Sequence, residues 1–373
     1  MTGRGPLHGV RMIELAGIGP GPYAAMLLAD LGADVVRIER PGPQVSAVPP
    51  ENDVLRRNRR SMVVDLREPK GVRTVLALAE RADVILEGFR PGVTERLGLG
   101  PEDCWAVNPR LVYGRMTGWG QSGPLAAAAG HDIGYVAVTG ALGAVGRAGE
   151  GPVPPVNFLG DFGGGSTFLV IGVLAALWEA AQSGKGQVVD AAIVDGASSL
   201  TALLHGLMAS GQWIDRRGVN FLDTGVPWYD TYETADGQWM AVGALEPKFY
   251  AVFTRLLGLT DEVTALRADT SEWPRLRRAI ADAFAARTRD EWVAVFEGTD
   301  ACVAPVLSLS EAASHPHLAA RRTFIDVGGI VQPAPAPRFS RTVAPAPAPP
   351  PALGADGADV LHDWGVDEVD VLI

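Results

Sequence analysis

The first third of the chain alternates between short apolar runs and stretches with helical spacing of apolar residues. The apolar runs lie at residues 11–15, 33–40, 61–66, 83–89 and 110–120. Helical stretches lie between several of them, at residues 24–32 and 71–82. Nearly continuous apolar strands that alternate with helices are typical of a parallel sheet covered on both faces. We therefore expect an α/β fold with a doubly wound sheet in this part of the chain.

The pattern changes after about residue 225. Residues 226–245 combine aromatic residues, strand-like alternation and an Asp-Gly turn, which indicate antiparallel strands. Residues 247–298 then show helical spacing, so we expect a second, smaller α+β domain. Residues 332–354 are rich in Pro and Ala and should be extended. A short helix at 358–365 should pack back on a domain surface.

This organisation predicts a large domain, a small domain and two connecting segments. The expected boundaries are 1–200 for the N-terminal part of the large domain, 201–224 for a linker, 225–300 for the small domain and 301–373 for a linker that returns to the large domain. The longest apolar run, 168–178, is too short to cross a bilayer, so we expect a buried helix. The glycines that begin at Gly17 do not match the dinucleotide fingerprint, because Pro22 occupies its sixth position.

Composition narrows the choice of partners. The 373 residues carry a formal net charge of −11, so we expect no nucleic acid, and an anionic ligand needs a local cationic pocket. The only cysteines are Cys104 and Cys302, which is typical of a reducing compartment. His315 and His317 lack a neighbouring ligand cluster, so we expect no metal site. The sequence predicts neither a signal peptide nor a membrane span, and we expect the protein in the cytoplasm.

Arginines gather where several predicted strands end. Four of them fall within residues 56–60, and others follow strands at Arg37, Arg40, Arg67, Arg90 and Arg96. Ligands bind at the carboxyl ends of strands in doubly wound sheets, and guanidinium groups suit phosphate oxygens. The cluster therefore indicates a polyanionic ligand, although charge runs are more often a solvated surface. Both interpretations stay open at this point.

Three carboxylates and a histidine stand beside predicted turns. His131 and Asp132 are either a loop histidine with a helix-capping acid or a site with a general base. Asp161 precedes three glycines and an apolar helix. It is either an N-cap or part of a site where backbone N–H groups receive negative charge. Glu246 precedes a helix that begins with proline, and alone it indicates only a charge near the helix dipole.

Several segments, taken in order along the chain, resemble the family III CoA-transferases. They are GPGPYAAMLLADLGADVVRIERPG, RRSMVVDLREPKG, ILEGFRPGVTERLGLG, NPRLVYGRMTGWGQSGP, AGHDIGY, GDFGGGS, EPKFY, DACVAPVL and PAPRFSRT. Within this family they are most similar to the racemases that act on alpha-methylacyl-CoA. The resemblance implies an acyl-CoA ligand and no further cofactor. It also implies an interlocked homodimer, in which each chain has a Rossmann-like large domain and a small domain.

The resemblance implies roles for individual residues as well. His131 and Asp161 match the acid–base pair of such racemases, and Glu246 matches a glutamate that orients the histidine from the other subunit. The positions that match CoA contacts are Arg40, Val64, Asp65, Leu66, Arg67, Gly130, Asp132, Ile133, Gly134 and Tyr135, with Arg90 and Arg96 at the pyrophosphate or adenine. Relatives usually carry Asn at the position of Gly134, and this departure puts the substrate preference in doubt.

The implied reaction is inversion of the α-carbon of a 2-methylacyl-CoA thioester through an enolate. It needs one proton-transfer group on each face of the planar intermediate, here His131 and Asp161, and backbone N–H donors for the enolate oxygen. The competing reaction is transfer of CoA between carboxylic acids. In that reaction Asp161 is the nucleophile, and no histidine is required at position 131. A third alternative is a non-catalytic acyl-CoA-binding homologue, which the complete acid–base set disfavours.

Overall fold

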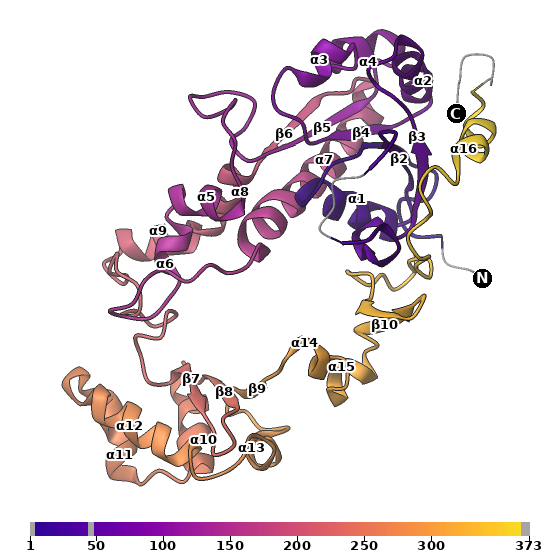
Figure 1. Ribbon diagram of the computed structural model, residues 1–373. Coiled ribbons are helices and arrows are strands. Elements are labelled where there is room, and N and C mark those ends of the chain that lie inside the picture. Colours follow the sequence, from indigo (N-terminus) through magenta and orange to yellow (C-terminus); the bar gives the residue numbers. More distant parts are fainter. Residues whose placement is uncertain (1–3, 44–47, 367–373) are drawn as a thin grey trace. The chain divides into compact units, whose positions relative to one another are not determined.

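A computed structural model describes residues 4–43 and 48–366 of the chain. Contacts divide the chain into two compact units, which we call the sheet unit and the small unit (Figure 1). The sheet unit comprises the described parts of residues 1–139, 156–200 and 316–373, and the small unit comprises residues 140–155 and 201–315.

The units differ from the expected domains in three places. Residues 140–155, expected in the large domain, group with the small unit. So do residues 201–224, expected as a linker, and residues 301–315, expected in the linker that returns to the large domain. One contact that ties the first of these segments to the small unit is an ion pair in which Arg147 Nη2 lies 2.8 Å from Asp230 Oδ1. Arg147 and Asp230 are far apart in the sequence. The local spacing of apolar residues therefore could not predict that they pair.

The sheet unit is built on six parallel strands in the order β3-β2-β1-β4-β5-β6. The strands are β1 (Arg11–Leu15), β2 (Asp34–Glu39), β3 (Arg59–Val63), β4 (Val84–Glu87), β5 (Val112–Thr117) and β6 (Val188–Ala192). This doubly wound order confirms the predicted α/β fold. The order reverses between β1 and β4, and ligands of such sheets bind outside the carboxyl ends of the strands at that reversal.

Helices cover both faces of this sheet. The helices of the sheet unit are α1 (Pro20–Asp30), α2 (Pro69–Ala79), α3 (Val93–Leu97), α4 (Pro101–Val107), α5 (Asp132–Val138), α7 (Thr167–Ser183), α8 (Ile193–Leu200), α15 (Pro316–Ala320) and α16 (Gly357–Trp364), of which α15 lies beside β10 rather than on the sheet (Figure 1). Successive strand residues point to opposite faces. Met12 packs in a core with α1 and α7, whereas its neighbour Ile13 packs in a second core with α2, α4 and α16. A two-stranded hairpin, β10 (Phe324–Val327) and β11 (Ile330–Pro333), also belongs to this unit.

The apolar run at 168–178 forms part of a longer helical stretch than the sequence predicted. A π-helical segment, η3 (Phe158–Ser166), continues directly into α7, and together they span Phe158–Ser183. By length and composition this 26-residue stretch could cross a membrane, and 33% of its most apolar window is buried. In the structure Leu169 and Val173 of α7 pack in the sheet core, whereas Ile171 and Trp178 are 60% and 73% exposed. The expected buried helix is therefore buried on one side only.

The small unit contains an antiparallel sheet and a layer of helices, which confirms the predicted α+β fold of this part. Its strands are β7 (Tyr229–Glu233), β8 (Trp239–Gly243) and β9 (Val303–Val306). Its helices are α6 (Ala141–Ala144), α9 (Ala202–Ala209), α10 (Pro247–Leu257), α11 (Asp261–Ala265), α12 (Trp273–Phe284), α13 (Arg289–Phe296) and α14 (Leu309–Ala312). Its core is aromatic, with Phe253, Phe284 and Trp292 packed together.

Candidate active site

Three adjoining cavities lie at the carboxyl edge of the parallel sheet, and residues of the sheet unit line all of them. The first, of about 440 Å³, lies at the ends of β2 and β3. The second, of about 380 Å³, lies at the ends of β1, β4 and β5, and the third, of about 300 Å³, lies beside β4, β5 and α5. Gly17 and Ile18 line both the first and the second cavity. Gly130, His131 and Tyr135 line both the second and the third.

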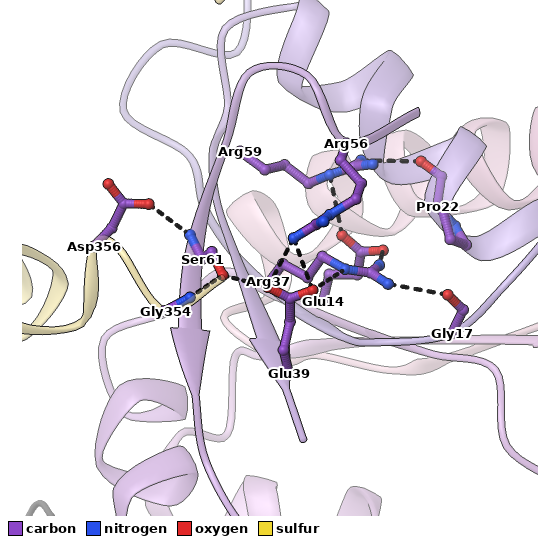
Figure 2. Close-up of polar contacts among 10 residues, drawn as sticks. All are labelled: Glu14, Gly17, Pro22, Arg37, Glu39, Arg56, Arg59, Ser61, Gly354 and Asp356. Carbon is purple, nitrogen blue, oxygen red and sulfur yellow. Dashed lines mark hydrogen bonds and ion pairs between the residues drawn. The ribbon is translucent and has the colours of Figure 1, made fainter. Parts of the chain in front are cut away.

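The arginines of residues 56–60 are mostly buried, and this overturns both interpretations of their sequence pattern. Arg56 is 4% exposed and Arg59 5% exposed. Figure 2 shows both arginines facing carboxylates at the ends of β1 and β2. Arg56 Nη2 lies 2.9 and 3.0 Å from the two carboxylate oxygens of Glu39, and Arg59 Nε lies 3.3 Å from Glu14 Oε2. A buried guanidinium needs such a partner, and these two are engaged by carboxylates rather than presented to a ligand phosphate.

The other arginines of this run are paired as well. Buried Arg57 donates to both carboxylate oxygens of Asp30, at 3.0 and 2.5 Å. Arg60 donates to Asp34, its Nε lying 3.0 Å from Oδ1. Carboxylates that lie 17 or more residues away in the sequence cannot be assigned as partners from local composition, so the run resembled a free cationic surface.

Residues 16–22, which comprise the turn after β1 and the first turn of α1 and which we call the β1–α1 loop, lie between the first cavity and the second. Two arginines of a buried ionic cluster donate hydrogen bonds to this loop (Figure 2). The cluster consists of Glu14, Arg37, Glu39, Arg56 and Arg59. Arg37 Nη2 donates to the carbonyl of Gly17 at 3.0 Å, and Arg59 Nη1 donates to the carbonyl of Pro22 at 2.9 Å. Ser166 adds a third link, because its hydroxyl lies 2.7 Å from the Pro20 carbonyl. The cluster therefore fixes the wall between the two cavities.

The C-terminal segment joins the same cluster. Ser61 of β3 donates its hydroxyl to Glu39 and accepts the N–H of Gly354 at 2.8 Å (Figure 2). The backbone N–H of Ser61 donates to Asp356 Oδ2 at 2.8 Å. Strand β3, which ends at the first cavity, is thus hydrogen-bonded to the C-terminal segment at Gly354 and Asp356.

His131 and Asp161 line the second cavity together. His131 is exposed and directly precedes α5. Asp161 lies in η3 and is half-buried. Burial and the negative charge of Asp132 raise the pKa of Asp161, while a hydrogen bond from Asn157 and the charge of His131 oppose this shift. A carboxyl group whose pKa is raised toward neutrality is suited to accept and return a proton.

Asp132 fixes the backbone of Asp161. Its Oδ1 accepts the backbone N–H of Asp161 at 2.7 Å, and α5 has no side-chain N-cap. The capping interpretation of Asp132 was therefore wrong. Gly160 permits this contact, because a Cβ there would lie 2.3 Å from Asp132 Oδ1. The sequence placed His131 and Asp132 side by side but gave no sign that Asp132 reaches the Asp161 segment.

The three glycines after Asp161 serve close packing. They lie within the helical turns of η3, and a Cβ at Gly164 would lie 2.6 Å from the backbone nitrogen of Ala197 in α8. At Gly165 it would lie 3.0 Å from Ile193. The expectation of a glycine-rich helix N-terminus with open N–H donors was therefore wrong, because η3 is itself helical and continues into α7.

The β1–α1 loop also approaches Asp161, a contact that the sequence analysis missed. Gly19 has φ +69°, and a Cβ there would lie 3.3 Å from Asp161 Oδ2. Two further glycines leave room for the ring of Tyr135. A Cβ at Gly118 would lie 2.0 Å from this ring, and a Cβ at Gly130 would lie 2.5 Å from it. Glycines that follow predicted strands were the available signal, but only the fold shows which side chain each glycine faces.

The predicted CoA contacts divide among the cavities. Those that line the first cavity are Arg40, Val64, Asp65, Leu66 and Arg67. Gly130 and Tyr135 line the second and third cavities, and Arg90 lines the third. Arg96, Asp132, Ile133 and Gly134 line none of these three cavities.

Two cations stand at the first cavity. Arg40 is exposed, and its Nη2 donates to the carbonyl of Pro43 at 2.6 Å. Arg67 Nη2 lies 2.7 Å from Asp65 Oδ2, and its hydrogen bonds lower the pKa of Asp65 to about 2. The position of Gly134 is open, since a Cβ there would meet no heavy atom within 4 Å.

Glu246 belongs to the small unit, where it is exposed and directly precedes α10. The cavities that hold His131 and Asp161 are lined by the sheet unit. The predicted contact between Glu246 and a histidine therefore stays a prediction. Among the described residues, no group of three or more His, Cys, Asp or Glu side chains could hold a metal ion.

Comparison with known proteins gives the family. The sequence model of CoA-transferase family III matches residues 7–357. The chain belongs to this family. The alpha-methylacyl-CoA racemase of Mus musculus is 45% identical over 98% of this chain and 95% of its own length, and that of Homo sapiens is 42% identical with the same coverage. The succinyl-CoA:glutarate CoA-transferase of Mus musculus is 31% identical over 96% of this chain and 86% of its own length.

Family members of known structure share the fold. A CAIB/BAIF family protein from Brucella suis superposes with a TM-score of 0.82 and is 27% identical, covering 97% of this chain and 100% of its own. Proteins similar to this chain thus include both racemases and CoA-transferases.

Proposed function

We propose that this protein is an acyl-CoA racemase that inverts the α-carbon of 2-methylacyl-CoA thioesters. The observation that carries the proposal is that His131 and Asp161 line one cavity, in a chain 45% identical to a racemase over nearly its full length. Inversion requires two proton-transfer groups that face a single carbon, and both are present. CoA transfer requires only a nucleophilic carboxylate, so it leaves His131 without a role.

The proposed reaction begins when one of the two groups removes the α-proton. The C–H bond breaks, its electron pair moves into the C–C–O unit, and the thioester oxygen becomes an enolate oxygen. The second group then donates a proton to the opposite face, and the two groups exchange roles in the reverse direction. The raised pKa of Asp161 favours this exchange of acid and base roles, because its carboxyl group keeps a proton at a pH closer to neutral than the carboxyl group of an ordinary Asp does.

The enolate oxygen needs a hydrogen-bond donor. The N–H of Asp161 is already donated to Asp132. We assign the donor role to the backbone N–H of Asp132. Asp132 itself lines none of the three cavities, but it directly follows His131, which lines the second cavity, and its N–H forms no hydrogen bond within the described parts of the chain. A preorganised donor of this kind contributes about 2.7–4 kcal/mol to transition-state stabilisation.

The CoA part of the substrate would extend from the second cavity into the first. There Arg40 and Arg67 would bind its phosphate groups. Arg90 would reach the pyrophosphate or adenine side through the third cavity. We propose a homodimer in which Glu246 of the partner subunit orients His131, and a cytoplasmic location. The proposed reaction needs no further cofactor.

The proposal is tested by incubation of a 2-methylacyl-CoA with the enzyme in D₂O, without any acceptor acid. We expect one deuterium at the α-carbon by mass spectrometry, together with loss of optical purity. A parallel reaction with an added carboxylic acid tests for transfer. Unlabelled thioester, combined with a new CoA ester of the added acid, would show a CoA-transferase with Asp161 as the nucleophile.

A further inference from the structure

The side chain of Glu246 receives little support from its own unit. Glu246 is exposed, has an extended backbone (φ −74°, ψ 144°) and directly precedes α10. Its carboxylate forms no hydrogen bond or ion pair with any residue that the structure describes. The direction in which the carboxylate points therefore depends on the backbone that carries it.

That backbone is held at three consecutive residues. Gly243 donates its N–H to the carbonyl of Cys302 at 2.9 Å, and Ala244 donates to the carbonyl of Trp228 at 3.0 Å. The third contact comes from a side chain, since Arg267 Nη2 donates to the carbonyl of Leu245 at 2.6 Å. Leu245 directly precedes Glu246, so this is the hydrogen bond nearest to the carboxylate on that side.

Arg267 differs from the buried arginines described above, because it is only half-buried and no carboxylate pairs with it in the described chain. Its guanidinium lies 4.5 Å from the ring centroid of Trp228 and 4.4 Å from that of Tyr250. These aromatic faces attract the cation, while Nη1 is buried without a hydrogen-bond partner. Only part of the guanidinium is withdrawn from solvent, and the hydrogen bond to the Leu245 carbonyl is the one that the structure describes for it.

We propose that Arg267 is a positioning residue that fixes the backbone bearing Glu246 in the conformation the reaction requires. The inference rests on the proposed function, in which Glu246 orients the catalytic histidine. Arg267 lines none of the three cavities, which sheet-unit residues line. Its loss should therefore slow the chemical step without weakening acyl-CoA binding.

The test compares Arg267→Met, Arg267→Lys and Glu246→Gln by kcat and KM for racemisation. A displacement of about 1 Å at a positioned group lowers the rate about 100-fold. We therefore expect Arg267→Met to lower kcat about 10- to 100-fold while KM stays within about threefold. Arg267→Lys keeps the charge between the rings and one donor, and should recover part of kcat. In a Glu246→Gln background, Arg267→Met should cause no further loss.

Arg289→Met is the matched control in the same unit. Arg289 also binds a backbone carbonyl, that of Val306, at 3.1 Å, but it pairs with Glu311 and lies away from Glu246 in the sequence. We expect Arg289→Met to lower the melting temperature and leave kcat unchanged. Equal kcat losses in Arg267→Met and Arg289→Met would overturn the inference, and so would a multiplied loss in the double variant.

A wild-type rate for Glu246→Gln would also overturn the inference, and it would remove Glu246 from the mechanism. Failure of the proposed function itself is distinguishable, because the wild-type enzyme would then incorporate no deuterium. If Arg267→Met does not fold, the same comparison is made with Arg267→Lys, which should fall between the wild type and Glu246→Gln.

Discussion

Replacement of Gly19 by alanine would place a methyl group against the carboxylate of Asp161. The added Cβ would lie 3.3 Å from Asp161 Oδ2, closer than most carbon contacts of this kind. The backbone of Gly19 also has φ +69° and ψ −121°, a region that residues with a Cβ rarely adopt. The substitution therefore strains the β1–α1 loop and displaces the carboxylate at the same time.

The two effects have separate magnitudes. Backbone strain at such a residue lowers the free energy of unfolding by about 1–3 kcal/mol. Displacement of the carboxylate by a few tenths of an ångström should lower the exchange rate by about tenfold, since about 1 Å corresponds to about 100-fold. The assays are urea unfolding for stability and deuterium incorporation from D₂O for the rate.

Two alanine variants separate these effects. Gly9 has φ +93°, but a Cβ there would meet no atom within 4 Å, so Gly9→Ala should be destabilised without slower exchange. Gly21 lies in the same loop with an ordinary φ and open space, so Gly21→Ala should retain stability. Exchange at the wild-type rate in Gly19→Ala would refute the reasoning, as would an equal loss of rate in Gly9→Ala.

Three further predictions concern charge, substrate preference and pH. Arg40→Gln should raise KM for acyl-CoA severalfold at low salt and less at high salt, because exposed charge interactions are screened; a KM unchanged at low salt would remove Arg40 from the phosphate site. Gly134→Asn should change the free energy of unfolding by less than about 0.5 kcal/mol in a urea melt, since its Cβ meets open space; a loss above about 2 kcal/mol would contradict the open position. Asp161→Asn should raise stability at pH 7 but not near pH 3. Because the pKa of Asp161 is raised in the folded state, the wild-type protein loses stability as pH rises from the unfolded-state pKa through the folded-state pKa, and Asn avoids this loss. An Asp161→Asn variant that is less stable than the wild type at pH 7 would contradict this prediction.

The parallel sheet could be predicted because its strands lie in the interior. Val35 and Val36 are both buried although they point to opposite faces, and this produces the continuous apolar runs of the sequence. The same reasoning predicted a ligand site at the carboxyl edge of the sheet from the arginines, but it did not place His131 and Asp161 there. The motifs and their order along the chain indicated the family. Only the folded structure shows that His131 and Asp161, which are 30 positions apart, line one cavity.

The arginine run and the glycine run could not be interpreted from local sequence. The partners of Arg56 and Arg59 are glutamates on β1 and β2, and pairing across strands depends on sheet order rather than on composition. Gly164 is required by the approach of α8, which follows about 30 residues later. In both cases the cause is a long-range contact, whereas local patterns report only capping, turns and periodicity.

The two-base claim is tested most directly by separate exchange measurements on the two enantiomers of a 2-methylacyl-CoA in D₂O, with the variants His131→Ala and Asp161→Ala. If each group serves one face of the α-carbon, both variants lose racemisation, and each loses initial α-proton exchange from a different enantiomer. Loss of exchange from the same enantiomer in both variants would contradict the account. Wild-type racemisation in either variant would contradict it as well.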